Sequence, residues 1–89
     1  MNCIQAILTI DTESLPENFQ EIIKHEREVI AAWKAEGFLD QLFLRPTRNG
    51  AILIFKNLTE EEVNGKMKTL PLYPLMKSLE VLPLIADTI

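Results

Sequence analysis

Apolar residues are spaced along this chain in two different ways, and the spacing predicts six secondary-structure elements. In four segments apolar and β-branched residues alternate or run together briefly, as they do in strands. In the segment 16–36 they recur every three or four residues, as in an amphipathic helix, and capping residues predict a second helix further along the chain. In chain order we expect a strand over 3–10, a helix over 16–36, strands over 39–45 and 51–56, a helix that begins after residue 59, and a strand over 78–84.

Capping and turn residues support these boundaries. Ser14 and Glu17 have the spacing of a capping box, so we expect the first helix to begin there. Gly37 can adopt the left-handed conformation that ends a helix, and Asn49-Gly50 can adopt positive φ in a hairpin between the second and third strands. Thr59 is expected to cap the second helix, whose first residues are acidic and suit the positive end of the helix dipole.

The order strand, helix, strand, strand, helix, strand is that of the ferredoxin-like α+β fold, an antiparallel sheet with both helices on one face. Both faces of the predicted sheet are apolar, because Ile4 and Leu8 alternate with Ile7, and Leu53 alternates with Ile54. Two helices can cover only one of these faces. We therefore expect a homodimer in which two copies pack sheet to sheet, as a dimeric α+β barrel.

Composition and charge narrow the classes of function. The chain has 89 residues, 47% of them hydrophobic, which suits one domain over 1–89. A net charge of −4 without a Lys/Arg cluster argues against nucleic acid as a partner. No apolar run approaches the ~20 residues of a membrane span and no signal-peptide pattern is present, so we expect a cytoplasmic protein without a membrane partner. With one cysteine, no metal-ligand spacing and no glycine-rich phosphate loop, no metal or cofactor is expected.

One carboxylate lies where apolar residues are expected. The core-facing stripe of the first helix comprises Phe19, Ile22, Ile23, Val29, Ile30 and Trp33. Glu26 falls near the centre of this stripe, with His25 on its flank. A buried carboxylate must be hydrogen-bonded, paired, or protonated with a raised pKa, and a raised pKa suits proton transfer near neutral pH. Glu26 and His25 are thus candidate catalytic residues. The alternative for Glu26 is a structural ion pair, for example with Arg45, or a side chain that reaches solvent.

Three further residues are candidates for binding a substrate. Arg45, at the end of the second strand, could bind a carboxylate bidentately or form a salt bridge with a partner subunit. Tyr73 lies between two prolines, where its ring can pack while its hydroxyl reaches a pocket. Trp33 could serve as a ligand platform, although its helical spacing from Ile30 also suits the core.

The segment Leu70-Pro71-Leu72-Tyr73-Pro74-Leu75-Met76 cannot lie inside a regular helix or a central strand, because its two prolines lack backbone donors. We expect a rigid, buried connection into the last strand. This motif closely resembles the same junction in muconolactone isomerases. The resemblance extends without a gap from about residue 22 to 84 and includes an acid-rich helix segment that ends Ala35-Glu36-Gly37. The glutamate of the isomerase helix matches Glu26, and Glu28 is also matched.

The resemblance implies a small ferredoxin-like protein whose dimers associate further, and an enzyme that moves a double bond within a lactone by proton abstraction and return, without a cofactor. One segment differs. The isomerases carry a basic Trp-Arg-His-Leu-Trp-Arg stretch after the helix glycine, whereas this chain has Asp40 and Gln41 in place of the arginine and the histidine.

Two functional hypotheses follow. In the first, the protein is a cofactor-independent isomerase that acts on a small lactone or enolisable carbonyl compound, with Glu26 as proton shuttle, His25 as auxiliary acid or base, and Arg45 as anion anchor. In the second, it is a non-catalytic dimeric barrel that binds a small apolar ligand or serves as an assembly module. The hypotheses differ in whether Glu26 and His25 open into a pocket or are closed by packing and ion pairs.

Overall fold

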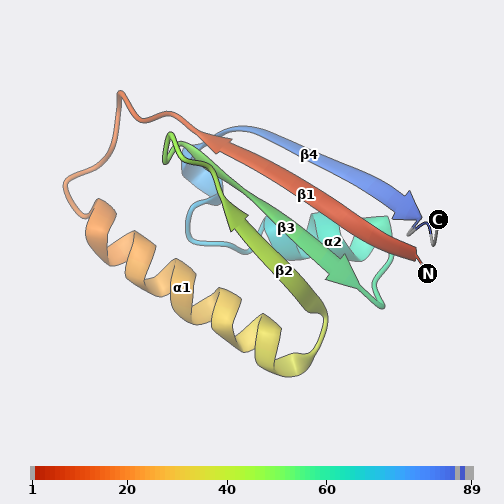
Figure 1. Ribbon diagram of the computed structural model, residues 1–89. Helices are drawn as coiled ribbons and strands as arrows, with labels where there is room; N and C mark the ends of the chain where they lie inside the picture. The colour runs from red at the N-terminus through yellow and green to blue at the C-terminus, as the bar shows by residue number, and fades with distance from the viewer. Residues whose placement is uncertain (1, 86, 88–89) are drawn as a thin grey trace.

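The structure of the protein, a computed structural model, describes residues 2–85 and residue 87. The elements are, in chain order, β1 (Asn2–Ile10), α1 (Phe19–Glu36), β2 (Leu39–Leu44), β3 (Gly50–Lys56), α2 (Glu60–Met67), the short 3-10 helix η1 (Tyr73–Leu75) and β4 (Met76–Ile85). The strands form one sheet in the order β2-β3-β1-β4, and every neighbouring pair is antiparallel. Both helices lie on the same side of this sheet (Figure 1). The predicted ferredoxin-like α+β fold is confirmed.

The core lies between the sheet and the helices. Alternate residues of the two central strands are buried on the helix side: Ile4, Ala6, Leu8 and Ile10 of β1 and Ala51, Leu53 and Phe55 of β3. Trp33 of α1 and Val63 and Met67 of α2 belong to the same cluster. The alternate residues of the strands and the apolar residues at helical spacing therefore pack into one core, as the sequence predicts.

The first helix begins later than predicted. Its first residue is Phe19, its N-cap residue is Asn18, and no side chain caps it. The capping box expected from Ser14 and Glu17 is therefore wrong, because residues 11–18 form turns and bends before the helix starts. The amide of Phe19 bonds to the carbonyl of Pro16 at 3.1 Å, which makes proline part of the approach turn rather than the first helical turn. The C-terminal end is as predicted, since Gly37 adopts the left-handed conformation with φ 92°.

The hairpin between β2 and β3 also differs from its prediction. The amide of Arg48 bonds to the carbonyl of Arg45 at 2.9 Å, and the amide of Arg45 bonds to the carbonyl of Gly50 at 3.1 Å. Among the described residues, the turn residue with positive φ is Arg48, at 59°, and not Asn49 or Gly50. Gly50 instead begins β3, where an added Cβ would meet the carbonyl oxygen of Leu8. Its lack of a side chain thus allows close approach of β1 rather than a turn.

The second helix begins as predicted. Thr59 and Glu62 form a complete capping box, in which the Glu62 amide donates to Thr59 Oγ1 at 3.1 Å and the Thr59 amide donates to Glu62 Oε1 at 3.0 Å. After α2 the chain turns inward at two buried leucines, Leu70 and Leu72, on either side of Pro71. The predicted connection into the last strand is therefore present, but only its first part is buried. Its second part, η1, lies directly before β4 and contains no buried residue.

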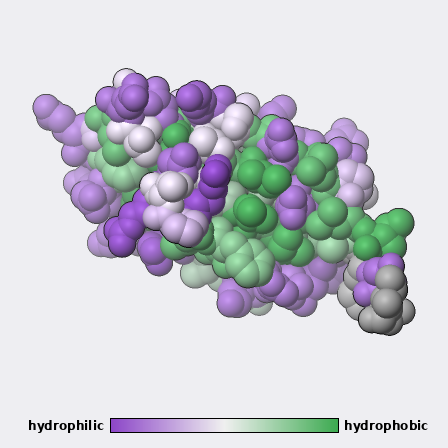
Figure 2. Space-filling view, turned by 45° about the horizontal axis from the view of Figure 1, so that its top comes forward, coloured by the Kyte–Doolittle hydropathy of each residue, from purple (hydrophilic) through white to green (hydrophobic). Residues whose placement is uncertain are grey.

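No described element covers the sheet face opposite the helices. Its members on the central strands, among them Ile7, Ile52 and Ile54, are partly exposed, while Phe43 of β2 is 51% exposed and Leu82 of β4 is 43% exposed. Figure 2, in which the strand side of the molecule comes forward, shows hydrophobic residues gathered in one patch with hydrophilic residues around it. We call this surface the open sheet face. Within the described residues, no helix is both long and apolar enough to span a membrane.

Candidate active site

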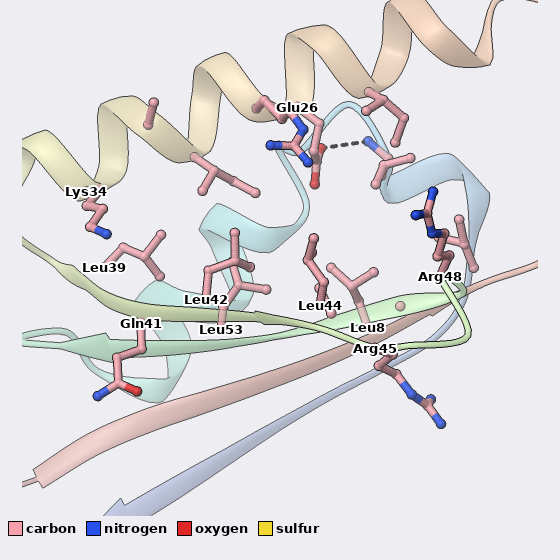
Figure 3. Close-up of a pocket in the computed structure, with 18 of the residues that line it drawn as sticks. Leu8, Glu26, Lys34, Leu39, Gln41, Leu42, Leu44, Arg45, Arg48 and Leu53 are labelled. Atoms are coloured by element: carbon pink, nitrogen blue, oxygen red, sulfur yellow. Dashed lines mark hydrogen bonds between the residues drawn. The ribbon is translucent and has the colours of Figure 1, made fainter.

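A groove of about 810 Å³ separates α1 from the β2 edge of the sheet (Figure 3). Its floor is apolar and comes from the strands and the proline junction: Leu8, Ile10, Leu39, Leu42, Leu44, Ala51, Leu53 and Leu72. Its wall is one face of α1, with residues spaced three or four apart: Phe19, Gln20, Ile23, Glu26, Arg27, Ile30, Ala31 and Lys34. The volume and the mostly apolar lining are typical of a small-molecule site.

The groove exists because β2 is an edge strand that α1 does not cover completely. Leu42 pairs with Leu53 and Leu44 pairs with Ala51, so these two leucines of β2 share the helix side of the sheet with buried residues. Leu42 is nevertheless 40% exposed and Leu44 is 63% exposed. Both point into the space below α1 (Figure 3). Apolar side chains that face a core but remain open to solvent mark a place where another molecule can be buried.

Glu26 lies in the middle of the α1 wall and is 4% exposed. Its Oε1 accepts a hydrogen bond of 3.1 Å from the amide of Leu72, and its second carboxyl oxygen is directed into the groove (Figure 3). Burial raises the pKa of Glu26 above its ordinary value of 4.5, and the Leu72 bond and the charge of His25 oppose this rise. The carboxyl group thus combines a fixed orientation with a raised affinity for a proton.

The ion pair considered for Glu26 is not formed. Among the described residues, the salt bridge within 4.0 Å joins Lys56 to Asp40, at 3.8 Å, and does not involve Glu26. Arg45 borders the groove at the end of β2, but its guanidinium group points away from Glu26 (Figure 3). The carboxyl group is therefore buried without a cationic partner from the part of the chain that the structure describes.

The other residues singled out from the sequence lie outside the groove. His25 is exposed on α1 and acts on Glu26 only through its charge. Trp33 is 7% exposed, and its ring packs at 5.8 Å from Phe55 and 6.1 Å from Phe38, so it belongs to the core. Tyr73 is 38% exposed in η1 and does not line the groove. Of the five candidates, Glu26 and Arg45 border this site.

The two positions that differ from the isomerase pattern are also placed away from Glu26. Asp40 lies at a register shift between Leu39 and Gln41 and pairs with Lys56 on the neighbouring strand. Gln41 points away from the space below α1 (Figure 3). Neither side chain supplies the positive charge expected at this end of β2.

Two contributors to the site were missed by the sequence analysis. The amide of Leu72 is a backbone group, so no residue type announces its role, although the proline junction signalled a fixed conformation. Arg48 lines the groove because of its turn conformation, which was predicted for Asn49-Gly50 instead. Among residues 2–85 and 87, no group of three or more His, Cys, Asp or Glu side chains could hold a metal ion.

Comparisons with known proteins agree with this architecture. The family model described as muconolactone delta-isomerase matches residues 3–87. A crystal structure of muconolactone isomerase is similar with a TM-score of 0.75 and 19% identity, over 98% of this chain and 91% of that one. A crystal structure of an antibiotic biosynthesis monooxygenase has a TM-score of 0.63 and 17% identity, over 99% of this chain and 100% of that one.

A 5-chloro-2-hydroxyhydroquinone dehydrochlorinase from Burkholderia phenoliruptrix, in complex with 2,5-dihydroxybenzoquinone, has a TM-score of 0.56 and 16% identity, over 88% of this chain and 89% of that one. No curated protein matches the chain. At these identities the structural neighbours establish the fold, whereas the family model covers nearly the whole sequence. The chain belongs to the muconolactone delta-isomerase family.

Proposed function

We propose that this protein is a cofactor-independent isomerase that moves a C=C bond in a small lactone or enolisable carbonyl compound, with Glu26 as the proton shuttle. Membership of the isomerase family supports the class of reaction. The observation that carries the proposal is the Glu26 carboxyl group, which is 4% exposed, has a raised pKa and opens into an apolar groove. Burying a carboxylate in such a place lowers the stability of the fold, so its presence there indicates a role other than stability.

The reaction needs one group that both removes and returns a proton. To move a C=C bond by one position, a proton leaves one carbon, the electron pair shifts through the conjugated carbonyl system, and a proton adds two carbons away. In the proposal, the ionised Glu26 carboxylate takes the first proton and the resulting acid returns it. The Leu72 amide fixes Oε1, so the other oxygen is available to substrate carbons in the groove.

The environment of Glu26 suits both halves of this cycle. General acid–base catalysis is most efficient when the pKa of the group lies near the working pH. Burial raises the pKa of Glu26 and so strengthens the carboxylate as a base, while the Leu72 bond and the charge of His25 keep the ionised form accessible. His25 is proposed to tune Glu26 through this charge. A ligand that covers Leu42 and Leu44 would displace water from the apolar floor, which would protect the intermediate.

We also propose that the protein is a homodimer joined through the open sheet face. The support is the exposure of Phe43 (51%) and Leu82 (43%), together with the partly exposed isoleucines between them. Apolar residues on all four strands make one surface, and a second copy presents the same surface in return. Sheet-on-sheet packing would bury this surface without closing the groove, which lies on the helix side of the sheet.

The experiment that tests the isomerase is an NMR assay with muconolactone and a panel of small unsaturated lactones. An active enzyme converts at least one compound to its double-bond isomer faster than buffer does, without any added metal or cofactor. Binding without conversion would support the alternative, a non-catalytic barrel that holds a small apolar ligand. If no compound of the panel is bound or converted, the support for a lactone site is lost.

A further inference from the structure

We propose that Arg48, and not Arg45, is the residue that binds an anionic group of the ligand in the groove. This inference rests on the proposed function in one respect only, because it assigns the ligand to the same groove. It concerns which cation this chain uses, because Asp40 and Gln41 stand in β2 where the muconolactone isomerases carry an arginine and a histidine.

The direction of the two arginines is set by the hairpin. Arg45 and Arg48 begin and end the same turn, in which the Arg48 amide bonds to the Arg45 carbonyl at 2.9 Å. Arg48 is directed towards the α1 side of the sheet, whereas Arg45 is directed towards the opposite side (Figure 3). Glu26 and the groove lie on the α1 side. A ligand held beside Glu26 can therefore meet the guanidinium of Arg48 but not that of Arg45.

The backbone conformation that directs Arg48 is unfavourable for its residue type. Its φ of 59° is left-handed, a region that glycine and asparagine adopt more readily than residues with long side chains. Asn49 and Gly50 are next in sequence, yet the arginine takes this position. Strained backbone at a binding site is commonly retained for the placement of a side chain.

Charge favours an anion at this end of the groove. Four cationic residues border the groove, but Arg45 points away from it and Lys34 lies at the end opposite the hairpin (Figure 3). Arg27 and Arg48 remain, although the chain as a whole carries a net charge of −4. The acidic side chains that line it are Glu26 and Asp40. Asp40 lies at the beginning of β2, away from the hairpin, and is paired with Lys56. A low-dielectric groove with excess positive charge concentrates anions.

The guanidinium of Arg48 is also available. Its residue is exposed, and among the described residues its side chain takes part in no ion pair or hydrogen bond. A planar guanidinium binds a carboxylate through two parallel hydrogen bonds, which gives orientation as well as affinity. A ligand carboxylate held by Arg48 would leave the apolar part of the ligand over Leu44 and Leu42, towards Glu26.

Benzoate and benzamide test this assignment, because they have the same shape and differ in charge. Binding of each is measured by NMR chemical-shift titration at millimolar concentrations, for the wild type, Arg48→Gln, Arg48→Gly, Arg45→Gln and the exposed control Lys77→Gln. We expect the wild type to prefer benzoate. Arg48→Gln and Arg48→Gly should bind benzoate about tenfold more weakly, equal to about 1.4 kcal/mol, with benzamide unchanged. Arg45→Gln and Lys77→Gln should keep the preference.

Arg48→Gly serves as the second variant because glycine accepts the left-handed conformation, so this variant removes the guanidinium without adding strain. The proposal is overturned if the wild type shows no preference for benzoate, if neither probe binds, or if the preference is lost in Arg45→Gln and kept in Arg48→Gln. Conversion of muconolactone is measured separately. If the preference depends on Arg48 but muconolactone is not converted, the anion site stands and the proposed isomerase activity fails. If muconolactone is converted without this preference, the isomerase activity stands and the anion site fails.

Discussion

The amide of Leu72 donates a hydrogen bond of 3.1 Å to Oε1 of Glu26, across 46 positions of sequence. This bond joins the middle of α1 to the proline junction, and both groups are buried. The junction is thus more than a connection into β4, because it fixes one carboxyl oxygen while the other faces the groove. A buried amide that would otherwise lack a partner and a carboxylate that needs one satisfy each other.

Replacement of Glu26 by glutamine should leave the protein as stable as the wild type or more stable, by up to about 1 kcal/mol. The amide oxygen can still accept the bond from Leu72, and the cost of burying a charge is removed. Denaturant unfolding followed by the fluorescence of Trp33, the single tryptophan, measures the change. Glu28→Gln, on the exposed side of the same helix, is the matched control. A loss of ~3 to 5 kcal/mol would indicate a broken buried ion pair instead.

Stability should also depend on pH in a direction set by Glu26. Because burial raises its pKa above 4.5 in the folded protein, the folded state holds this proton more tightly than the unfolded chain does. The contribution of the group to the free energy of unfolding is fully present below the unfolded pKa, and it is lost as pH rises through the folded pKa.

Unfolding measured over a range of pH for the wild type and Glu26→Gln isolates this contribution. The glutamine variant should gain on the wild type as pH rises above 4.5, and the difference should level off above the folded pKa. If the wild type instead gains on the variant over the same interval, the pKa of Glu26 is lowered by folding and a favourable partner must exist.

The prolines of the junction should stabilise the fold. Pro71 precedes the buried Leu72, and Pro74 lies in the first turn of η1, where the missing amide costs nothing. Pro71→Ala and Pro74→Ala should each lower the free energy of unfolding by roughly 1 kcal/mol, since proline restricts the unfolded chain. Chemical denaturation compares both with the wild type. Unchanged midpoints in both variants would show that the junction is not conformationally constrained.

Light scattering at micromolar concentration should give the mass of a dimer or of a multiple of it. Phe43→Asp places a charge in the open sheet face and should produce monomers, because Phe43 is 51% exposed and contributes little to the core of one copy. Leu15→Asp is the control, since Leu15 is 39% exposed in the loop before α1 and lies outside that face. A wild-type protein that is a monodisperse monomer would rule out the barrel.

Much of the fold could be predicted because it depends on periodicity. The alternation around Ile4 and Leu53 assigned the strands to their faces, and helical spacing placed Glu26 in the apolar stripe of α1. The start of α1 could not be predicted in the same way. Ser14 and Glu17 match a capping box in sequence, but the chain between them and Asn18 turns instead, and local patterns do not determine which option the surrounding structure favours.

The site was predictable only where a side chain's position follows from its place on an element. Glu26 meets that condition, whereas Trp33 could face either the core or a ligand, and packing against Phe38 and Phe55 decided for the core. Arg45 and Arg48 differ by three positions in one turn, and their opposite directions depend on a backbone angle that the residue types do not favour. Such a detail requires the three-dimensional structure.

Proton exchange into a bound lactone tests the central claim, that Glu26 moves a proton in the groove, most directly. Muconolactone is incubated in D2O with the wild type, with Glu26→Gln and with Glu28→Gln, and deuterium incorporation at carbon is followed by NMR. The wild type and Glu28→Gln should exchange at equal rates, and Glu26→Gln should be slower by about 10² to 10⁴, the usual contribution of a general acid–base. Equal exchange by Glu26→Gln and the wild type would contradict the account.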